Sequence, residues 1–144
     1  MTPQFSLLIH FLVLCIAIVI CDLKWRIIPD FLTLPGVIFA FVVNTIDPGL
    51  IGYKASFVGF WTGWGAIFLG GMSCFAISDK PAMGGGDLKL LGMIGAFWGW
   101  KVALTTFAIA PIAGSLFAMA FNQTRMPYGA FLIGSSIGAL ILWQ

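Results

Sequence analysis

Long stretches of this 144-residue chain carry no charge, and its seven basic and five acidic residues fall in short groups between them. The charge-free stretches cover residues 1–21, 31–46, 55–78, 90–100, 102–124 and 126–144. A helix that spans a membrane needs about 17–25 mainly apolar residues. Most of the stretches are long enough, and the two shortest become so if their helices extend into the charged flanks. The pattern therefore predicts an all-α membrane protein, a bundle of about six transmembrane helices.

The composition excludes an ordinary soluble protein. Only 8% of the residues are charged and 60% are hydrophobic, whereas soluble domains carry about 25% charged residues. The net charge of +2 is too small to suggest a nucleic-acid partner. Cys15, Cys21 and Cys74 form no C-x-x-C pair, so they indicate neither a zinc site nor a disulfide framework. No repeat divides the chain, and residues 1–144 are expected to form one domain.

The expected helices cover residues 5–21, 31–46, 55–77, 87–100, 102–121 and 128–143. The first is interpreted as a retained helix and not a signal peptide, because no basic segment precedes it and no small-residue cleavage site comes before Asp22. Glycines spaced four apart allow helix backbones to approach closely, most simply within the bundle. These pairs are Gly59/Gly63, Gly95/Gly99 and Gly134/Gly138.

The basic residues predict an orientation, because cytoplasmic loops of membrane proteins are rich in Lys and Arg. The six-helix arrangement puts five basic residues on one side, namely Lys24, Arg26, Lys80, Lys89 and Arg125. Lys54 and Lys101 are on the other side. The first side is therefore expected to be cytoplasmic, with both termini outside. Trp98, Trp100 and Trp143 are expected at the outer interface.

The acidic residues are few, and four of the five fall on the predicted cytoplasmic side; they are Asp22, Asp30, Asp47, Asp79 and Asp87, with only Asp47 outside. Asp22 closes the first helix and Asp87 opens the fourth. An ionisable group beside a membrane helix is a functional candidate, although a helix cap or an interface anchor is an equally simple role. The surrounding segments favour function. They read GGGD at 84–87, DLKWRIIPD at 22–30 and MPYGAFL at 126–132.

Over nearly its whole length the chain resembles the type IV prepilin peptidases, membrane aspartyl proteases that remove the short basic leader of prepilins and pseudopilins. The resemblance rests on the G-x-G-D segment, on Ile28-Pro29-Asp30 and on Pro127-Tyr128-Gly129. It implies that Asp22 and Asp87 are the catalytic pair, at the cytoplasmic face of the inner membrane, with no metal or cofactor. Ala130 departs from the family pattern, in which many members have a second proline.

A second departure concerns methyl transfer. Many bacterial members carry an N-terminal extension with C-x-x-C pairs and also methylate the new pilin N-terminus. This sequence has neither feature, so we expect a peptidase without methyltransferase activity, similar to the small peptidases of Flp, or tight-adherence, systems.

Peptide hydrolysis by two aspartates needs one ionised and one protonated carboxyl close together. Asp87 begins a helix and Asp22 ends one, so helix dipoles predict Asp87 as the resting base and Asp22 as the resting acid. Lys24 and Lys89 could offset these dipoles, while Gly84 and Gly86 would let backbone and substrate approach Asp87. Asp79 could meet the basic leader.

Two other polar residues are expected to have structural roles. Asp30 is more simply an N-cap than a catalytic acid, and His10 a hydrogen-bonded residue within the first helix.

Two other classes of function remain open at this stage. A small proton- or cation-coupled transporter could use intramembrane aspartates, but no inverted repeat is evident and the acids gather at one face. A structural membrane subunit would leave the three segments around the acids without an explanation.

Overall fold

The computed structural model describes residues 3–25, 27–47, 50–78, 84–121 and 128–143. These residues form six α-helices and no strand, which confirms the predicted all-α class. The helices are α1 (Pro3–Trp25), α2 (Asp30–Ile46), α3 (Gly52–Ser78), α4 (Gly85–Trp98), α5 (Trp100–Phe121) and α6 (Tyr128–Trp143). All six lie where the charge-free stretches predicted them. α1 extends furthest beyond its prediction, through Asp22 to Trp25.

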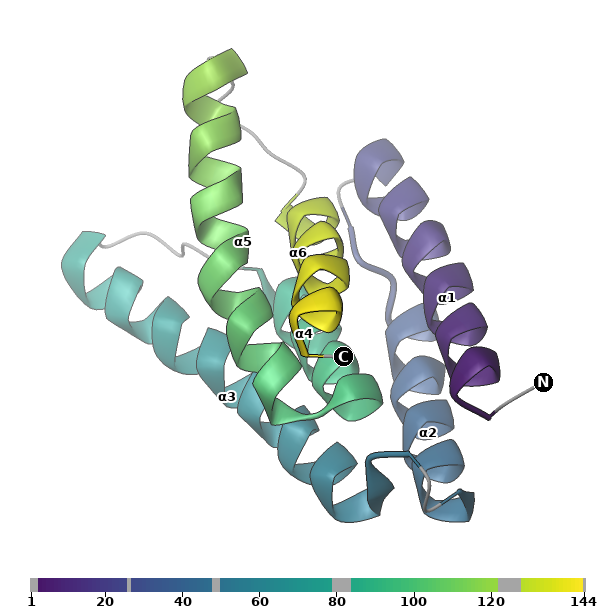
Figure 1. The fold of residues 1–144 in the computed structure, drawn as a ribbon. Helices are drawn as coiled ribbons and strands as arrows, with labels where there is room; N and C mark the ends of the chain where they lie inside the picture. The colour runs from purple at the N-terminus through teal and green to yellow at the C-terminus, as the bar shows by residue number, and fades with distance from the viewer. Residues whose placement is uncertain (1–2, 26, 48–49, 79–83, 122–127, 144) are drawn as a thin grey trace.

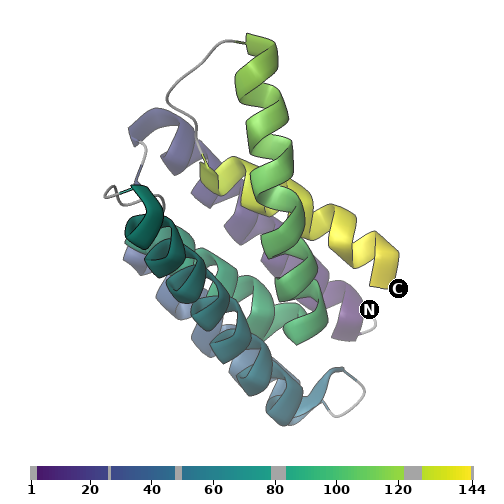
Figure 2. The same ribbon diagram turned by 90° about the vertical axis from the view of Figure 1, so that its left-hand side faces the viewer.

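Successive helices run in alternating directions (Figure 1). The C-terminal ends of α1, α3 and α5 and the N-terminal ends of α2, α4 and α6 therefore lie toward the same end of the bundle, in the upper part of that view. We call this the acid end, because Asp22, Asp30 and Asp87 all lie there. The two chain termini lie toward the opposite end (Figures 1 and 2).

α4 is the central helix. Its residues 90–97 are all buried, and it packs against α2, α3, α5 and α6. Large hydrophobic side chains are exposed on each of the other five helices, among them Ile16, Ile38, Leu69, Met119 and Ile141. Exposed apolar surface on this scale suits a lipid environment. Within the described residues, α1 and α5 are long and apolar enough to cross a membrane, while α2 and α6 are shorter apolar helices.

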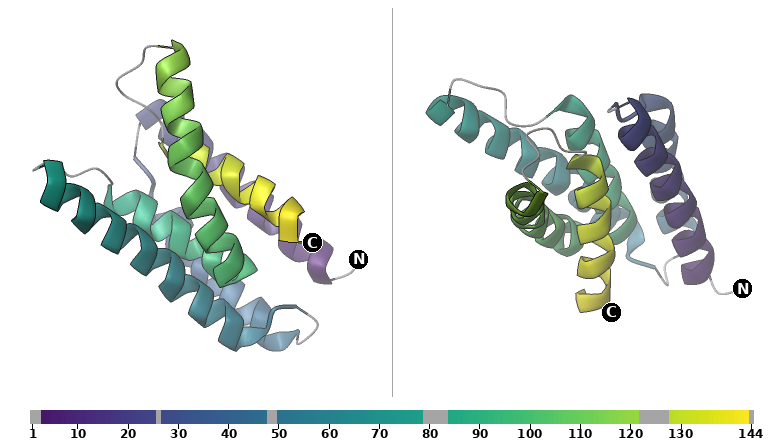
Figure 3. Two further views of the ribbon diagram at one scale, coloured as in Figure 1. Left: turned by 60° about the vertical axis from the view of Figure 1, so that its left-hand side comes forward. Right: turned by 90° about the horizontal axis from the view of Figure 1, so that it is seen from above.

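Glycines bring α3 and α4 into direct backbone contact (Figure 3). A Cβ atom built on Gly59 would overlap the carbonyl group of Gly95, and one on Gly63 would overlap that of Leu91. The predicted close approach is confirmed for this pair of helices. It is wrong for Gly134 and Gly138 of α6, where a built Cβ meets nothing within 4 Å. The spacing is the same, but these two positions face outward.

A buried polar contact ties α2, α3 and α4 together. Asn44 Nδ2 and Ser56 Oγ both donate to the carbonyl oxygen of Ala96, over 3.1 Å and 2.5 Å. Both side chains are almost fully buried. A polar group in an apolar interior must be hydrogen-bonded to be tolerated, so this contact fixes the relative positions of the three helices.

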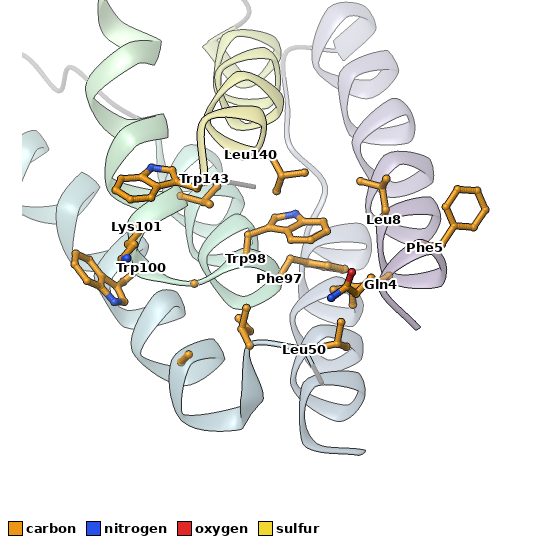
Figure 4. A pocket seen from close by; sticks show the side chains of 15 residues that line it. Gln4, Phe5, Leu8, Leu50, Phe97, Trp98, Trp100, Lys101, Leu140 and Trp143 are labelled. Atoms are coloured by element: carbon orange, nitrogen blue, oxygen red, sulfur yellow. The ribbon is translucent and has the colours of Figure 1, made fainter. Parts of the chain in front are cut away.

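A cavity of about 880 Å³ opens at the opposite end of the bundle (Figure 4). Trp98, Trp100 and Trp143 line it together with Lys101, whose Nζ lies 4.8 Å from the centre of the Trp143 ring. The three tryptophans thus gather at one end, as predicted for an interfacial belt. None of the aspartates within the described residues lines this cavity.

Candidate active site

Asp22 and Asp87 both lie at the acid end, on α1 and α4. Asp22 is in the last turn of α1 and is only 6% exposed. Asp87 is the third residue of α4 and is half-buried. The two carboxyl groups interact electrostatically, although 65 positions separate them in the sequence. A negative charge on Asp22 therefore disfavours a second negative charge on Asp87.

The Asp22 carboxylate faces the first residues of α6. The backbone N–H groups of Gly129 and Ala130 donate to it, and a Cβ atom on Gly129 would lie only 2.8 Å from Asp22 Oδ2. Any residue larger than glycine would therefore push the carboxylate away. The free N–H groups at a helix N-terminus favour a negative charge. The sequence predicted that Asp22 ends its own helix, but it could not predict that the N-terminus of α6 would face the same carboxylate.

One oxygen of Asp22 is left without an ordinary hydrogen bond. Oδ2 is fully buried, and within the described segments no donor meets it in standard geometry. Buried polar atoms in native proteins are nearly always satisfied, and exceptions occur where a group has chemical work or binds a ligand or water. Asn44 Oδ1 and Thr106 Oγ1 share this state, so the feature that distinguishes Asp22 Oδ2 is its close contact with Gly129.

Asp87 contributes to the start of its own helix. The N–H of Gly84, the N-cap residue, donates to Asp87 Oδ2 over 3.3 Å, and the Asp87 N–H donates to the Gly84 carbonyl over 3.2 Å. This reciprocal turn resembles half of a capping box. The helix-cap role that the sequence allowed for Asp87 is thus present in the structure. The same hydrogen bond fixes the Asp87 carboxylate at the acid end. Gly84 acts through its N–H, since a Cβ there would make only ordinary contacts.

Ile28 brings the three motif segments together. It is 8% exposed and lies between two glycines. A Cβ on Gly86 would lie 2.9 Å from Ile28 Cβ, and a Cβ on Gly129 would lie 3.2 Å from Ile28 Cδ1. The glycine next to Asp87 and the glycine against Asp22 therefore both press on one side chain. The expected close approach at Gly86 exists, but its described neighbour is Ile28.

Asp30 forms an ion pair with Lys89. Lys89 Nζ lies 2.6 Å from both carboxylate oxygens. The prediction that Asp30 caps α2 is wrong, because Pro29 occupies the N-cap position and no side chain caps the helix there. The Lys89 ammonium attracts the Asp30 carboxylate more strongly than a backbone N–H would. Lys89 thus lies at the acid end with its ammonium group on Asp30, and its predicted effect on Asp87 stays a prediction.

The other predicted residues have different contacts or fall outside the described residues. Lys24 Nζ lies 4.9 Å from the centre of the Trp25 ring, and no ion pair joins it to an acid within the described segments. Asp79 falls outside the described residues. His10 Nδ1 is 2.7 Å from the Ser6 carbonyl oxygen, which confirms its hydrogen-bonded role. In the described part of the chain, no three His, Cys, Asp or Glu side chains gather as metal ligands.

Sequence reasoning missed Ile28 and Gly129 as individual contributors. Both lie inside segments that it singled out, but their partners are distant in the sequence. The glycine of the Pro127-Tyr128-Gly129 segment was the available signal, since a glycine at a helix start often marks a close approach.

The type IV leader peptidase family model matches residues 9–143 of this chain. Its curated relatives include the prepilin leader peptidase/N-methyltransferase of Pseudomonas putida, which is 26% identical over 130 residues, or 81% of this chain and 43% of that protein. The protein of the same name from Xanthomonas campestris pv. campestris is 30% identical over 125 residues, which cover 77% of this chain and 41% of the relative.

The prepilin leader peptidase/N-methyltransferase of Stutzerimonas stutzeri is 26% identical over 141 residues, which cover 89% of this chain and 46% of the relative. The chain thus spans less than half the length of these relatives. No solved structure matches it.

Proposed function

The chain belongs to the type IV leader peptidase family, and on that basis we propose that it is a prepilin leader peptidase that cuts with Asp22 and Asp87. One observation carries the proposal. Three segments far apart in the sequence converge on two electrostatically coupled acids, through Ile28 between Gly86 and Gly129. The convergence supports a pair of carboxyl groups that act together, the arrangement that peptide hydrolysis of the aspartic type uses.

In the proposed reaction, one ionised carboxylate takes a proton from a water molecule while the water oxygen attacks the scissile carbonyl carbon. The other carboxyl, which begins protonated, first hydrogen-bonds to the carbonyl oxygen. As the tetrahedral diol forms, that carboxyl gives its proton to the carbonyl oxygen. The first carboxyl, now protonated, then protonates the amine nitrogen while the second takes a proton from the diol, and the C–N bond breaks. The N–H groups of Gly129 and Ala130 hold Asp22 in place, and that of Gly84 holds Asp87.

Assignment of the acid and the base stays a prediction. The helix-end argument made Asp87 the resting base, but Asp22 also faces a helix N-terminus, that of α6. Both carboxylates therefore receive backbone donors, and the dipoles no longer separate them. Site-resolved titration of the two carboxyls in the folded protein decides the order, and Asp22 losing its proton first would overturn the original assignment.

We further propose that six helices cross the cytoplasmic membrane, with the acid end in the cytoplasm and both termini outside. Lys24 and Lys89 lie at the acid end, and Lys54 and Lys101 lie at the other. The remaining basic residues of the count, Arg26, Lys80 and Arg125, fall outside the described residues. Cysteine-accessibility labelling of residues introduced at each end tests this orientation in intact cells.

The proposed substrate is a prepilin, pseudopilin or Flp-type pilin with a basic leader. We also retain, as a proposal, the prediction that this chain cleaves its substrate without methylating the product. The relatives carry both activities in their names. Mass spectrometry of the processed N-terminus checks this point, since a methyl group adds a fixed mass.

The central experiment uses a host without its own leader peptidase. The chain is expressed with a prepilin, and Asp22→Asn and Asp87→Asn are compared with the wild type. Each variant is expected to lose about 10²–10⁴-fold in cleavage rate, the usual contribution of general acid–base catalysis. Asp47→Asn, which makes the same change of charge at the opposite end of the bundle, is the matched control. Leader removal by both active-site variants at the wild-type rate would defeat the proposal.

The transporter alternative receives no support from the described arrangement. Transporters bind their substrates and coupling ions near the middle of the membrane, whereas Asp22, Asp30 and Asp87 gather at one end of the bundle. Ion flux that depends on Asp22 or Asp87 in vesicles would reopen this alternative.

A further inference from the structure

We propose that Asp30 is the carboxylate that binds a cationic side chain of the substrate leader, and that Lys89 occupies this position until the substrate arrives. This inference rests on the proposed function, and it adds a recognition site to the catalytic pair. Leader binding would exchange one ammonium or guanidinium group for another at the same two oxygens.

The first argument is access. Asp30 is 57% exposed and Lys89 39% exposed, whereas Asp22 is 6% exposed. Asp87 is half-buried, and one of its oxygens is engaged by Gly84. Of the three described acids at this end, Asp30 is therefore the one that a peptide in solution can reach most easily.

The second argument is position. Lys89 follows Asp87 by two residues on α4, and Asp30 follows Ile28 by two residues. Because Ile28 packs on Gly86, the ion pair is held beside the start of α4. Asp30 therefore lies at the same end of the bundle as Asp22 and Asp87, the end that a peptide must reach for this pair to cut it. A positively charged leader is the chemical class that this carboxylate would attract.

The third argument is energetic. The Lys89 ammonium is 2.6 Å from both oxygens, so Asp30 is already arranged to receive a cation. An ion pair that is exposed on both sides contributes little net stability, because water solvates the separated charges well. Replacement of Lys89 by a substrate cation therefore costs little. A substrate bound at the scissile bond also presents its cation at high effective concentration.

The alternative is that the ion pair has a purely structural role. The two hypotheses predict opposite effects of the Lys89 substitution on leader affinity. If the pair only fastens α2 to α4, loss of either partner has the same effect on the protein. If Lys89 competes with the leader, loss of Asp30 weakens leader binding, whereas loss of Lys89 strengthens it. The charge-swapped double variant would restore a structural pair but would leave a lysine where the leader needs a carboxylate.

The test measures binding of a fluorescent basic leader peptide to the full chain in detergent, in an Asp87→Asn background that cannot cut. We expect Asp30→Asn to raise the Kd about two- to fivefold and Lys89→Gln to lower it by a similar factor, as for exposed ion pairs. The effects should fade as salt is raised. Asp30→Glu should keep most of the affinity, and Asp47→Asn should leave it unchanged.

A matched peptide with its basic residues replaced by Gln completes the test. The Gln peptide should bind the protein with Asp30 intact more weakly than the basic peptide does. The Asp30→Asn substitution should then cause no further loss of affinity for the Gln peptide. Equal loss of affinity in Asp30→Asn and Lys89→Gln, with rescue by the Asp30→Lys/Lys89→Asp double variant, would overturn the inference in favour of a structural pair. Unchanged affinity in Asp30→Asn would overturn it as well. Asp30-dependent binding without cleavage by the wild-type chain would instead contradict the proposed peptidase function.

Discussion

Replacement of Gly129 by alanine tests whether the contact between α1 and α6 sets the position of Asp22. The new Cβ would lie 2.8 Å from Asp22 Oδ2 and 3.2 Å from both Asp22 Cγ and Ile28 Cδ1. Heavy atoms in contact are normally separated by about 3.5–4.0 Å, so the carboxyl group must move by several tenths of an ångström or more. That movement takes it away from the Gly129 and Ala130 N–H groups.

Two opposing terms set the effect on stability. Overpacking in a filled interior costs about 1–3 kcal/mol, while alanine favours a helix over glycine by about 0.8–1 kcal/mol. The net loss is therefore about 0–2 kcal/mol, and the variant should still fold. The catalytic loss should be much larger, because a displacement of about 1 Å in a reacting group can lower the rate about 100-fold.

The assay compares kcat for leader cleavage with the thermal unfolding midpoint in the same detergent. Gly134→Ala is the matched control, since it makes the same change on the same helix where a Cβ meets nothing within 4 Å. We expect Gly134→Ala to keep both values and Gly129→Ala to lose mainly kcat. A Gly129→Ala variant with wild-type kcat would refute the argument that this glycine positions Asp22.

The remaining predictions also compare glycines that differ only in their surroundings. Gly86→Ala should lower the cleavage rate at least about tenfold, because its Cβ would press on Ile28 at 2.9 Å and shift the start of α4. Gly85→Ala is the control, since its Cβ would meet nothing within 4 Å and its cleavage rate should stay near that of the wild type. Equal cleavage rates for the two variants would contradict the contact between Gly86 and Ile28. Gly59→Ala should lower the unfolding free energy by about 1–3 kcal/mol or more, because its Cβ overlaps a backbone carbonyl of α4. Gly65→Ala, on the open side of α3, should not destabilise the fold, and a comparable loss there would refute the argument.

The helices could be predicted from the sequence because the physical signal is strong and local. A run of uncharged apolar residues has few alternatives to a helix in an apolar environment, and Asp or Gly-rich segments mark where it stops. The bounds of α2 and α6 differ from the prediction by a residue or none for this reason. α1 runs further than expected, because Asp22 is tolerated inside the helix once α6 supplies backbone donors.

The contacts within the site could be predicted only in part. The three segments were identified by their residue types, but their meeting point at Ile28 depends on how α1, α4 and α6 pack. Nothing near Asp30 in the sequence indicates that its partner is Lys89, 59 positions away. Glycine spacing also failed to predict which helices meet. Glycine pairs with the same spacing pack against α4 when they lie on α3 but face outward when they lie on α6. Local patterns determine the elements, whereas pairings between them depend on the whole fold.

The two acids are carried by helices that differ in mechanical support. Asp87 lies on α4, which four helices surround and which backbone contact with α3 holds firmly. Asp22 lies on α1, which packs mainly against α2 and α6 and reaches α4 through Phe11, whose ring lies beside Phe97. Thermal motion should therefore change the spacing of the acids chiefly through displacement of α1. Amide hydrogen exchange should accordingly be slower in α4 than in the last turns of α1, so that one catalytic group is a fixed reference and the other adjusts to it.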